Sequence, residues 1–139
     1  MISTTLRRIL GCGPCYDPRE RGLLPADQDL DAPISFDFMA SQLGVEFAIW
    51  AMRSAPEHDA TWGNFAAKVA NGAGIDPLDN CSYGAQAAYK TAKAAVEKVA
   101  KNRMENSMPS RRNAIYAYAR DDERRRQYAI LLSVLEETA

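Results

Sequence analysis

The chain has 139 residues, of which 47% are hydrophobic and 25% are charged, and its formal net charge is -1. Such a length suits one domain that buries its core without disulfides or metals, and the composition excludes a disordered or membrane-embedded chain. No apolar run approaches the roughly 20 residues needed to cross a bilayer, and the start of the chain has too short an apolar core for a signal peptide. We therefore expect one domain over residues 1–139, located in the cytoplasm.

Residues 1–33 are expected to form a short helix followed by an irregular acidic arm. Thr4 or Thr5 can cap a helix that ends at Leu10. Beyond this helix, four prolines and three glycines interrupt any regular period, which indicates turns and loops. The arm carries three aspartates at alternate positions, which would project to one side of an extended segment: Asp27, Asp29 and Asp31.

Residues 34–71 contain both tryptophans and all four phenylalanines, so we expect them to form the core. Ser35 fits the N-cap of a helix that runs to about Gln42 and ends at Gly44. The next helix, over residues 45–53, is apolar on nearly all sides and should be buried.

The clearest amphipathic pattern in the chain runs from Trp62 to Ala70, with apolar side chains at i, i+3, i+4, i+7 and i+8. Ser54-Ala-Pro-Glu57 fits a capping box at the start of this helix, and Asn71-Gly72 fits its end. We expect four aromatic side chains of the central segment to be buried: Phe47, Trp50, Trp62 and Phe65.

Residues 82–139 are expected to form long helices, after a loop that offers caps at Asp76 and Ser82. From Tyr83 to about Met104 the chain is rich in alanine and lysine, both good helix formers. A stripe of small side chains along this helix lets a partner helix approach closely. The segment should therefore be one half of a packed hairpin.

Pro109 breaks the helical pattern near the middle of this region. Ser110 can begin a helix through Arg120 with a last helix after it, or the two form a single helix. No alternating strand pattern of useful length occurs. The predicted fold class is all-α, a single-domain helical bundle of about five to seven helices with an irregular N-terminal arm.

Cys12-Gly-Pro-Cys15 has the sequence of the thioredoxin redox tetrapeptide. In such a site, a helix N-terminus that follows a buried strand lowers the pKa of the first thiol. Here the preceding residues TTLRRIL are typical of a helix, and no βαβ pattern surrounds the motif. We favour a turn in which Gly13-Pro14 starts a new helical turn, with reduced thiols here and at Cys81.

We expect no catalytic residue, no cofactor, no metal and no small-molecule substrate. Cys12, Cys15, Cys81 and His58 supply at most half of a zinc pattern, because the Cys-x2-Cys pair lacks its partner pair. His58 is flanked by two acidic residues at the start of a helix, where a solvated face explains it better than general-base chemistry. No Gly-rich phosphate loop or serine elbow occurs.

Charge is distributed unevenly along the chain. Residues 1–80 carry 6 Lys/Arg against 11 Asp/Glu, which gives -5, and residues 81–139 carry 11 against 7, which gives +4. The acidic arm can be a mimic of phosphates or a device for solubility, and the second reading is favoured. The candidate basic surface consists of five arginines: Arg111, Arg112, Arg124, Arg125 and Arg126.

With Tyr116 and Tyr118 nearby, these arginines can form a face for nucleic acid. Against this, residues 121–123 are acidic and would pair at i, i+3 or i+4 with the arginines that follow. A solvated charged helix face is therefore the favoured interpretation, and direct binding to nucleic acid is disfavoured.

Two runs of the chain resemble a group of short proteins encoded by phages and prophages. The first is the opening TTLRRIL with the following GPC, and the second is residues 36–70, which include IWAMR (49–53) and PEHD (56–59). The later helices, over 85–99 and 124–135, are similar to the alanine-rich and Arg-Gln-rich helices of that group. Cys12 departs from the pattern, and the alanine tract is short. The resemblance implies a helical fold and a mobile-element setting but no catalytic residue.

Small helical proteins without cofactors in that setting often bind and disable a host defence complex, and anti-CRISPR proteins are the best-known class. We therefore expect a stoichiometric inhibitor of a bacterial defence protein or ribonucleoprotein, with contacts through the arm aspartates or the five arginines. A nucleic-acid-binding protein and a thiol redox protein are the alternatives. A homodimer through Ile130 and Val134 also stays open.

Overall fold

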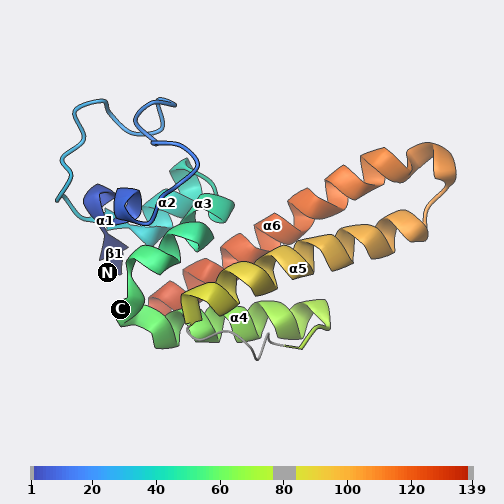
Figure 1. Cartoon of the computed structure of the whole chain (residues 1–139). Coiled ribbons are helices and arrows are strands. Elements are labelled where there is room, and N and C mark those ends of the chain that lie inside the picture. The colour runs from blue at the N-terminus through green and yellow to red at the C-terminus, as the bar shows by residue number, and fades with distance from the viewer. Residues whose placement is uncertain (1, 77–83, 138–139) are drawn as a thin grey trace.

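Helices make up most of the part of the chain that the computed structural model describes, residues 2–76 and 84–137 (Figure 1). The α-helices of this part are α1 (Leu6–Gly11), α2 (Phe36–Gln42), α3 (Val45–Ala51), α4 (Asp59–Ala73), α5 (Gly84–Glu105) and α6 (Arg112–Glu137). Short 3-10 turns lie between them at Met52–Ser54, Pro56–His58 and Pro109–Arg111. The all-α prediction is confirmed. The cap predicted at Ser82 lies outside the described residues.

The N-cap residues predicted from the sequence mark the starts of the first two helices correctly. The Thr5 hydroxyl accepts a hydrogen bond from the Arg8 backbone N–H at 3.2 Å, at the start of α1. The Ser35 hydroxyl accepts one from the Phe38 backbone N–H at 3.3 Å, at the start of α2. Both bonds join an N-cap oxygen to the third helical residue, which is the pairing that these side chains favour.

A two-stranded sheet, which the sequence did not predict, joins the N-terminus to the start of α2. β1 (Ser3–Thr4) pairs antiparallel with β2 (Ile34–Ser35). Strands of two residues are too short to show an alternating pattern. The pairing brings the N-terminus next to the C-terminal end of the irregular arm.

The predicted capping box before α4 is wrong. Ser54 is buried, and its hydroxyl lies 2.7 Å from the Thr4 hydroxyl and donates to the Ala51 carbonyl at 2.6 Å. Glu57 pairs instead with Arg8 of α1 at 2.7 Å. Ser54 therefore serves the contact between the N-terminus and the core, and the chain enters α4 through 3-10 turns.

The core forms around Phe36, Trp62 and Phe65, which are fully buried. The ring centroids of Phe36 and Trp62 lie 4.8 Å apart, and Trp62 Nε1 donates to a buried backbone carbonyl at 2.9 Å. Phe47 is also buried, as predicted. Trp50 is only half-buried, because it lies at the edge of the core where α3 faces the N-terminal arm.

The alanine-rich helix α5 packs mainly against α4 and α6, as its stripe of small residues predicts. α5 comes close to α4 at Gly84, where an added Cβ would overlap the Asp59 carbonyl oxygen. α4 itself ends two residues later than expected, at Ala73, and Gly74 closes it with a φ of 66°.

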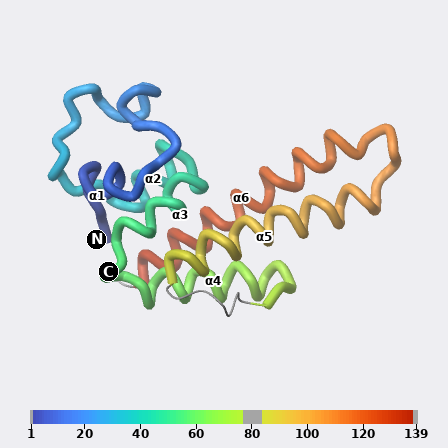
Figure 2. Tube along the Cα trace, in the orientation of Figure 1, coloured from blue at the N-terminus to red at the C-terminus, as the bar shows by residue number. Residues whose placement is uncertain are grey.

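α6 is one continuous helix, the second of the two forms that the sequence left open. Its N-terminal half and the C-terminal half of α5 project past the rest of the molecule as an antiparallel hairpin (Figures 1 and 2). Lys98 still reaches the body, because its Nζ donates to the Gly74 carbonyl at 2.6 Å. We call residues 101–120, which lie beyond that link, the hairpin tip.

The C-terminal half of α6 returns into the core. Val134 is fully buried and Ile130 is half-buried against the core cluster. The prediction that these residues are free to join a second copy is wrong for Val134, because the monomer already buries its side chain. Among the described helices, none is both long and apolar enough to span a membrane.

Candidate functional site

The five arginines predicted as a basic surface do not form one surface. Arg111 and Arg112 lie at the hairpin tip and are exposed, whereas the other three lie farther along α6. Consecutive residues of an α-helix are rotated by about 100° about its axis, so three adjacent arginines must diverge. Arg124 faces α3, Arg125 faces solvent, and Arg126 faces α4.

Arg126 belongs to a buried network with Glu123 and Gln127. Its Nε donates to Glu123 Oε2 at 2.8 Å and its Nη2 donates to the Val69 carbonyl of α4 at 3.0 Å. Gln127 Nε2 donates to Glu123 Oε1 at 3.2 Å and to the Ala92 carbonyl of α5 at 2.9 Å. The network thus joins α4, α5 and α6, and its function is structural.

The acidic run before these arginines pairs with them as predicted. Asp122 accepts from Arg125 at 3.1 Å and Glu123 from Arg126, both at i, i+3. A hydrogen bond from Arg103 of α5 at 2.8 Å is the main cause that lowers the pKa of Asp122 below its ordinary value. The prediction of a solvated face is wrong for Glu123, whose side chain is only 3% exposed.

Arg124 is half-buried and borders a pocket between α3, α5 and the N-terminal arm. Its Nη2 lies 3.4 Å from Glu46 Oε1, and its Nη1 donates to Gln127 Oε1 at 3.1 Å. Burial lowers the pKa of Arg124, and the Glu46 carboxylate opposes that shift. The guanidinium still stays protonated at neutral pH, because its ordinary pKa is so high.

The arm aspartates do not project together from an extended segment, because turns interrupt the arm. Asp29 Oδ1 accepts from the Asp31 backbone N–H at 2.9 Å, which closes a local turn. Asp31 forms a two-bond ion pair with Arg7 of α1, at 2.8 and 3.2 Å, and this hydrogen bonding lowers the pKa of Asp31. Asp27 is exposed. Two of the three carboxylates therefore hold the arm in place.

The hairpin tip is thin and largely solvated. Of its described side chains, Ala119 alone is buried, and four others are half-buried. Two large apolar side chains of the tip are strongly exposed: Met108, at 67%, and Tyr118, at 71%. The tip thus has almost no core of its own and presents apolar surface to solvent.

The tip is also basic. It contains five Lys/Arg against one Glu, which gives +4. Arg103 pairs with Asp122, and the Arg120 guanidinium lies 5.8 Å from the Tyr116 ring centroid. The remaining three cations, which pair with no carboxylate of the described residues, are Lys101, Arg111 and Arg112. Sequence reasoning found Arg111 and Arg112 but missed Lys101 and Met108, because only the structure shows that α5 and α6 project as one hairpin that carries all four exposed side chains.

The Cys12-Gly-Pro-Cys15 segment follows the C-terminal end of α1, where Cys12 is the C-cap. In a thioredoxin-type site the first cysteine instead precedes a helix N-terminus. The prediction that Gly13-Pro14 starts a new helical turn is wrong, since the chain continues through bends. Both thiols are exposed and unpaired, and no group of three potential metal ligands occurs among the described residues. Cys81 lies outside those residues.

Comparison with known proteins gave no match: no family model, no curated protein and no solved structure is significantly similar to this chain.

Proposed function

We propose that this protein acts by binding rather than by catalysis, and that its hairpin tip docks on an acidic surface of a protein partner. The observation that carries the proposal is the combination, on one projecting element, of three unpaired cations with the exposed side chains of Met108 and Tyr118. Tyr, Met and Arg are enriched in the cores of protein interfaces, and an unpaired positive surface favours a negative partner.

A protein partner accounts for more of the tip than a nucleic acid does. Phosphates would engage the cations, and a base would stack on Tyr118. That arrangement gives no role to Met108, which an apolar hollow at the centre of a protein interface would bury. The acidic character required of the partner follows from the net charge of the tip.

The resemblance to phage and prophage proteins supports a finer form of the proposal. The partner is then a bacterial defence complex, protein or ribonucleoprotein, which the tip blocks sterically in a stoichiometric complex. Expression of the protein in a panel of CRISPR-immune bacteria should restore plaque formation by a targeted phage in at least one strain, and Arg111→Glu/Arg112→Glu should abolish the rescue. If no strain is rescued, this finer form is wrong, while the docking proposal is tested separately.

The docking surface is tested by site-specific photocrosslinking in bacterial cells. A photoreactive residue at Tyr118 should give one covalent protein adduct, and the matched probe at Leu23 on the arm should not. The captured protein is then purified and titrated. Arg111→Glu/Arg112→Glu should weaken binding by about tenfold or more, because opposed like charges at an interface cost several kcal/mol. Asp27→Lys, on the arm, is the control.

Two results would overturn this assignment. The first is a Tyr118 adduct that contains nucleic acid, together with binding to bare DNA or RNA that weakens steeply with salt. The second is equal loss of affinity in the tip and arm variants, because the tip would then have no special role.

A further inference from the structure

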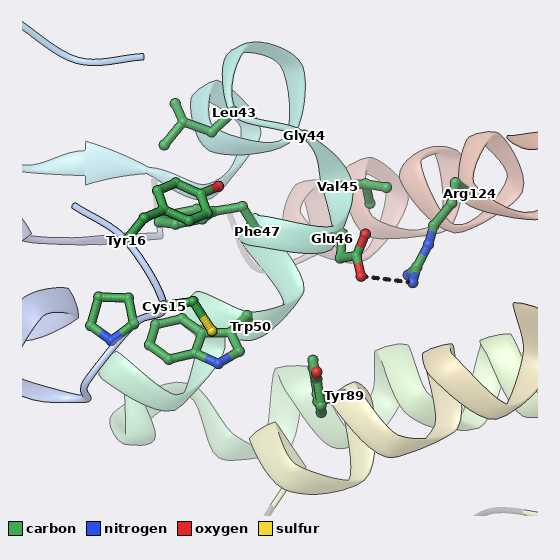
Figure 3. Close-up of a pocket in the computed structure, with 11 residues that line it drawn as sticks. Cys15, Tyr16, Leu43, Gly44, Val45, Glu46, Phe47, Trp50, Tyr89 and Arg124 are labelled. Atoms are coloured by element: carbon green, nitrogen blue, oxygen red, sulfur yellow. Dashed lines mark ion pairs between the residues drawn. The ribbon is translucent and has the colours of Figure 1, made fainter. Parts of the chain in front are cut away.

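A pocket of about 480 Å³ lies where the N-terminal arm, the α2–α3 corner and the long helices meet. This volume falls within the range of about 300–1,000 Å³ that is usual for small-molecule sites. Figure 3 shows the rings of Tyr16, Phe47 and Trp50 on one side of it and Arg124 with Glu46 on the other. Tyr89 of α5 completes the wall.

The aromatic side of the pocket is nearly continuous. The ring centroids of Tyr16 and Phe47 lie 5.9 Å apart, and those of Phe47 and Trp50 lie 6.3 Å apart. Trp50 stays half-buried although its segment otherwise forms the core, so part of its indole faces the pocket. Such a wall suits a flat apolar body, because aromatic rings favour offset or tilted stacking.

The charge around the pocket is positive. Arg21 lies 3.9 Å from the Tyr16 ring centroid, and Arg53 lies 4.3 Å from that of Trp50 and 5.0 Å from that of Tyr89. The pocket itself is lined by one guanidinium, that of Arg124, and one carboxylate, that of Glu46, so Arg21 and Arg53 add positive charge just outside it. A cationic ligand would meet the Arg124 guanidinium in the pocket, and Tyr16, Trp50 and Tyr89, which could attract it, already hold the guanidinium groups of Arg21 and Arg53.

Arg124 is the polar group best placed to hold an anion. The Arg124 side chain is 21% exposed, so its guanidinium has lost part of its hydration. Its ion-pair partner Glu46 is 70% exposed, so that carboxylate is largely hydrated and compensates the loss only weakly. At 3.4 Å the two atoms are also too far apart for a strong charge-assisted hydrogen bond. A ligand anion that reaches into the pocket can form the short bond that Glu46 does not.

We propose that this pocket binds a small aromatic monocarboxylate, with its ring on the Tyr16–Phe47–Trp50 wall and its carboxylate on Arg124. A monoanion fits better than a phosphate dianion, because one guanidinium faces the pocket and Glu46 repels a second negative charge more strongly. This site is independent of the hairpin tip, and it differs from the sequence-based expectation that the protein takes no small molecule.

The experiment compares 2-naphthoate with its neutral analogue 2-naphthamide by calorimetry. The carboxylate should bind the wild type about tenfold or more tighter than the amide, because hydrogen bonds to charged groups are worth roughly twice neutral ones. In Arg124→Gln, the two compounds should bind with nearly equal affinity. If Arg124 only supported the structure of the pocket, Arg124→Gln would weaken the binding of both compounds alike and leave the ratio of their affinities unchanged.

Glu46→Gln is the second variant, and its predicted effect has the opposite sign. Glu46 is exposed, so the fold should persist, and removal of the competing carboxylate should tighten naphthoate binding severalfold. Weaker or unchanged binding would overturn the assignment of Arg124 as the anion site. Tighter binding of 2-naphthyl phosphate than of naphthoate would overturn the choice of a carboxylate.

The two tryptophans provide an internal control by NMR. Naphthoate should shift the indole N–H resonance of Trp50, because Trp50 lines the pocket. The resonance of Trp62 should stay unchanged, because its indole N–H donates to the Ala55 carbonyl inside the core. No shift of the Trp50 resonance at ligand concentrations up to about 1 mM, the weak end of specific binding, would overturn the proposal.

Discussion

Removal of Arg126 should destabilise the protein strongly, although it belongs to a run of three arginines on a long helix. Arg126→Met takes away the bonds to Glu123 and to the Val69 carbonyl, and it leaves a buried carboxylate with Gln127 as its donor among the described residues. Breaking a buried ion pair costs about 3–5 kcal/mol. Since the Arg126 side chain is 31% exposed, water partly screens the site, and we expect about 3 kcal/mol, the lower end of that range.

Urea denaturation followed by circular dichroism measures this cost directly, and the melting temperature should fall by on the order of 10 °C. The matched control is Arg125→Met, one residue away. Its exposed pair with Asp122 predicts a change of less than about 0.5 kcal/mol.

The double variant Glu123→Leu/Arg126→Met removes both partners of the ion pair, so its stability can be compared with that of the variant that leaves Glu123 unpaired. Because it leaves no unpaired buried charge, it should be more stable than Arg126→Met alone. The single variant Glu123→Leu completes the cycle. If Arg126→Met stays within about 0.5 kcal/mol of the wild type, or if the costs of Glu123→Leu and Arg126→Met simply add in the double variant, the ion pair does not stabilise the fold.

Three further predictions concern other parts of the molecule. The hydrogen bonds from Arg8 hold the pKa of Glu57 at about 2, against an ordinary value of 4.5. Because the pKa is lower in the folded state, the ionised Glu57 stabilises the fold fully above pH 4.5, and this stabilisation is lost as the pH falls through 2. Glu57→Gln should therefore flatten the loss of stability in that window, and a Glu57 pKa of about 4 by NMR titration would contradict this. Thr91→Val should raise the free energy of unfolding by about 1 kcal/mol, since it removes a buried hydroxyl without a hydrogen-bond partner in the described structure; a loss of stability would show that the hydroxyl is bonded in solution. Backbone amides of the hairpin tip should exchange hydrogen faster than those of residues 84–100, because the tip has so little buried surface, and equal protection would contradict that account.

The sequence predicted most helices because their beginnings and faces are local properties. Thr5 and Ser35 cap the helices that they were expected to cap, and the Trp62 to Ala70 face is buried as its spacing predicts. Ser54 shows the limit of such reasoning. A capping box is defined by neighbours in the chain, whereas the hydroxyl bonds Thr4, fifty residues away. A partner so distant leaves no trace in local spacing.

The candidate sites show the same limit. A run such as Arg124 to Arg126 reads as one basic patch, but helix rotation sends its members to a pocket, to solvent and to a buried network. Trp50 was expected in the core, and its exposure depends on where the arm passes α3. Burial and charge pairing were thus decided by packing between segments that are far apart in the chain.

The claim that the protein acts through its hairpin tip is tested most directly by equilibrium binding to the purified partner captured from position 118. The account predicts that Arg111→Glu/Arg112→Glu lowers affinity by about tenfold or more while the fold and the affinity of Asp27→Lys stay unchanged. Unchanged affinity in the tip variant would contradict it.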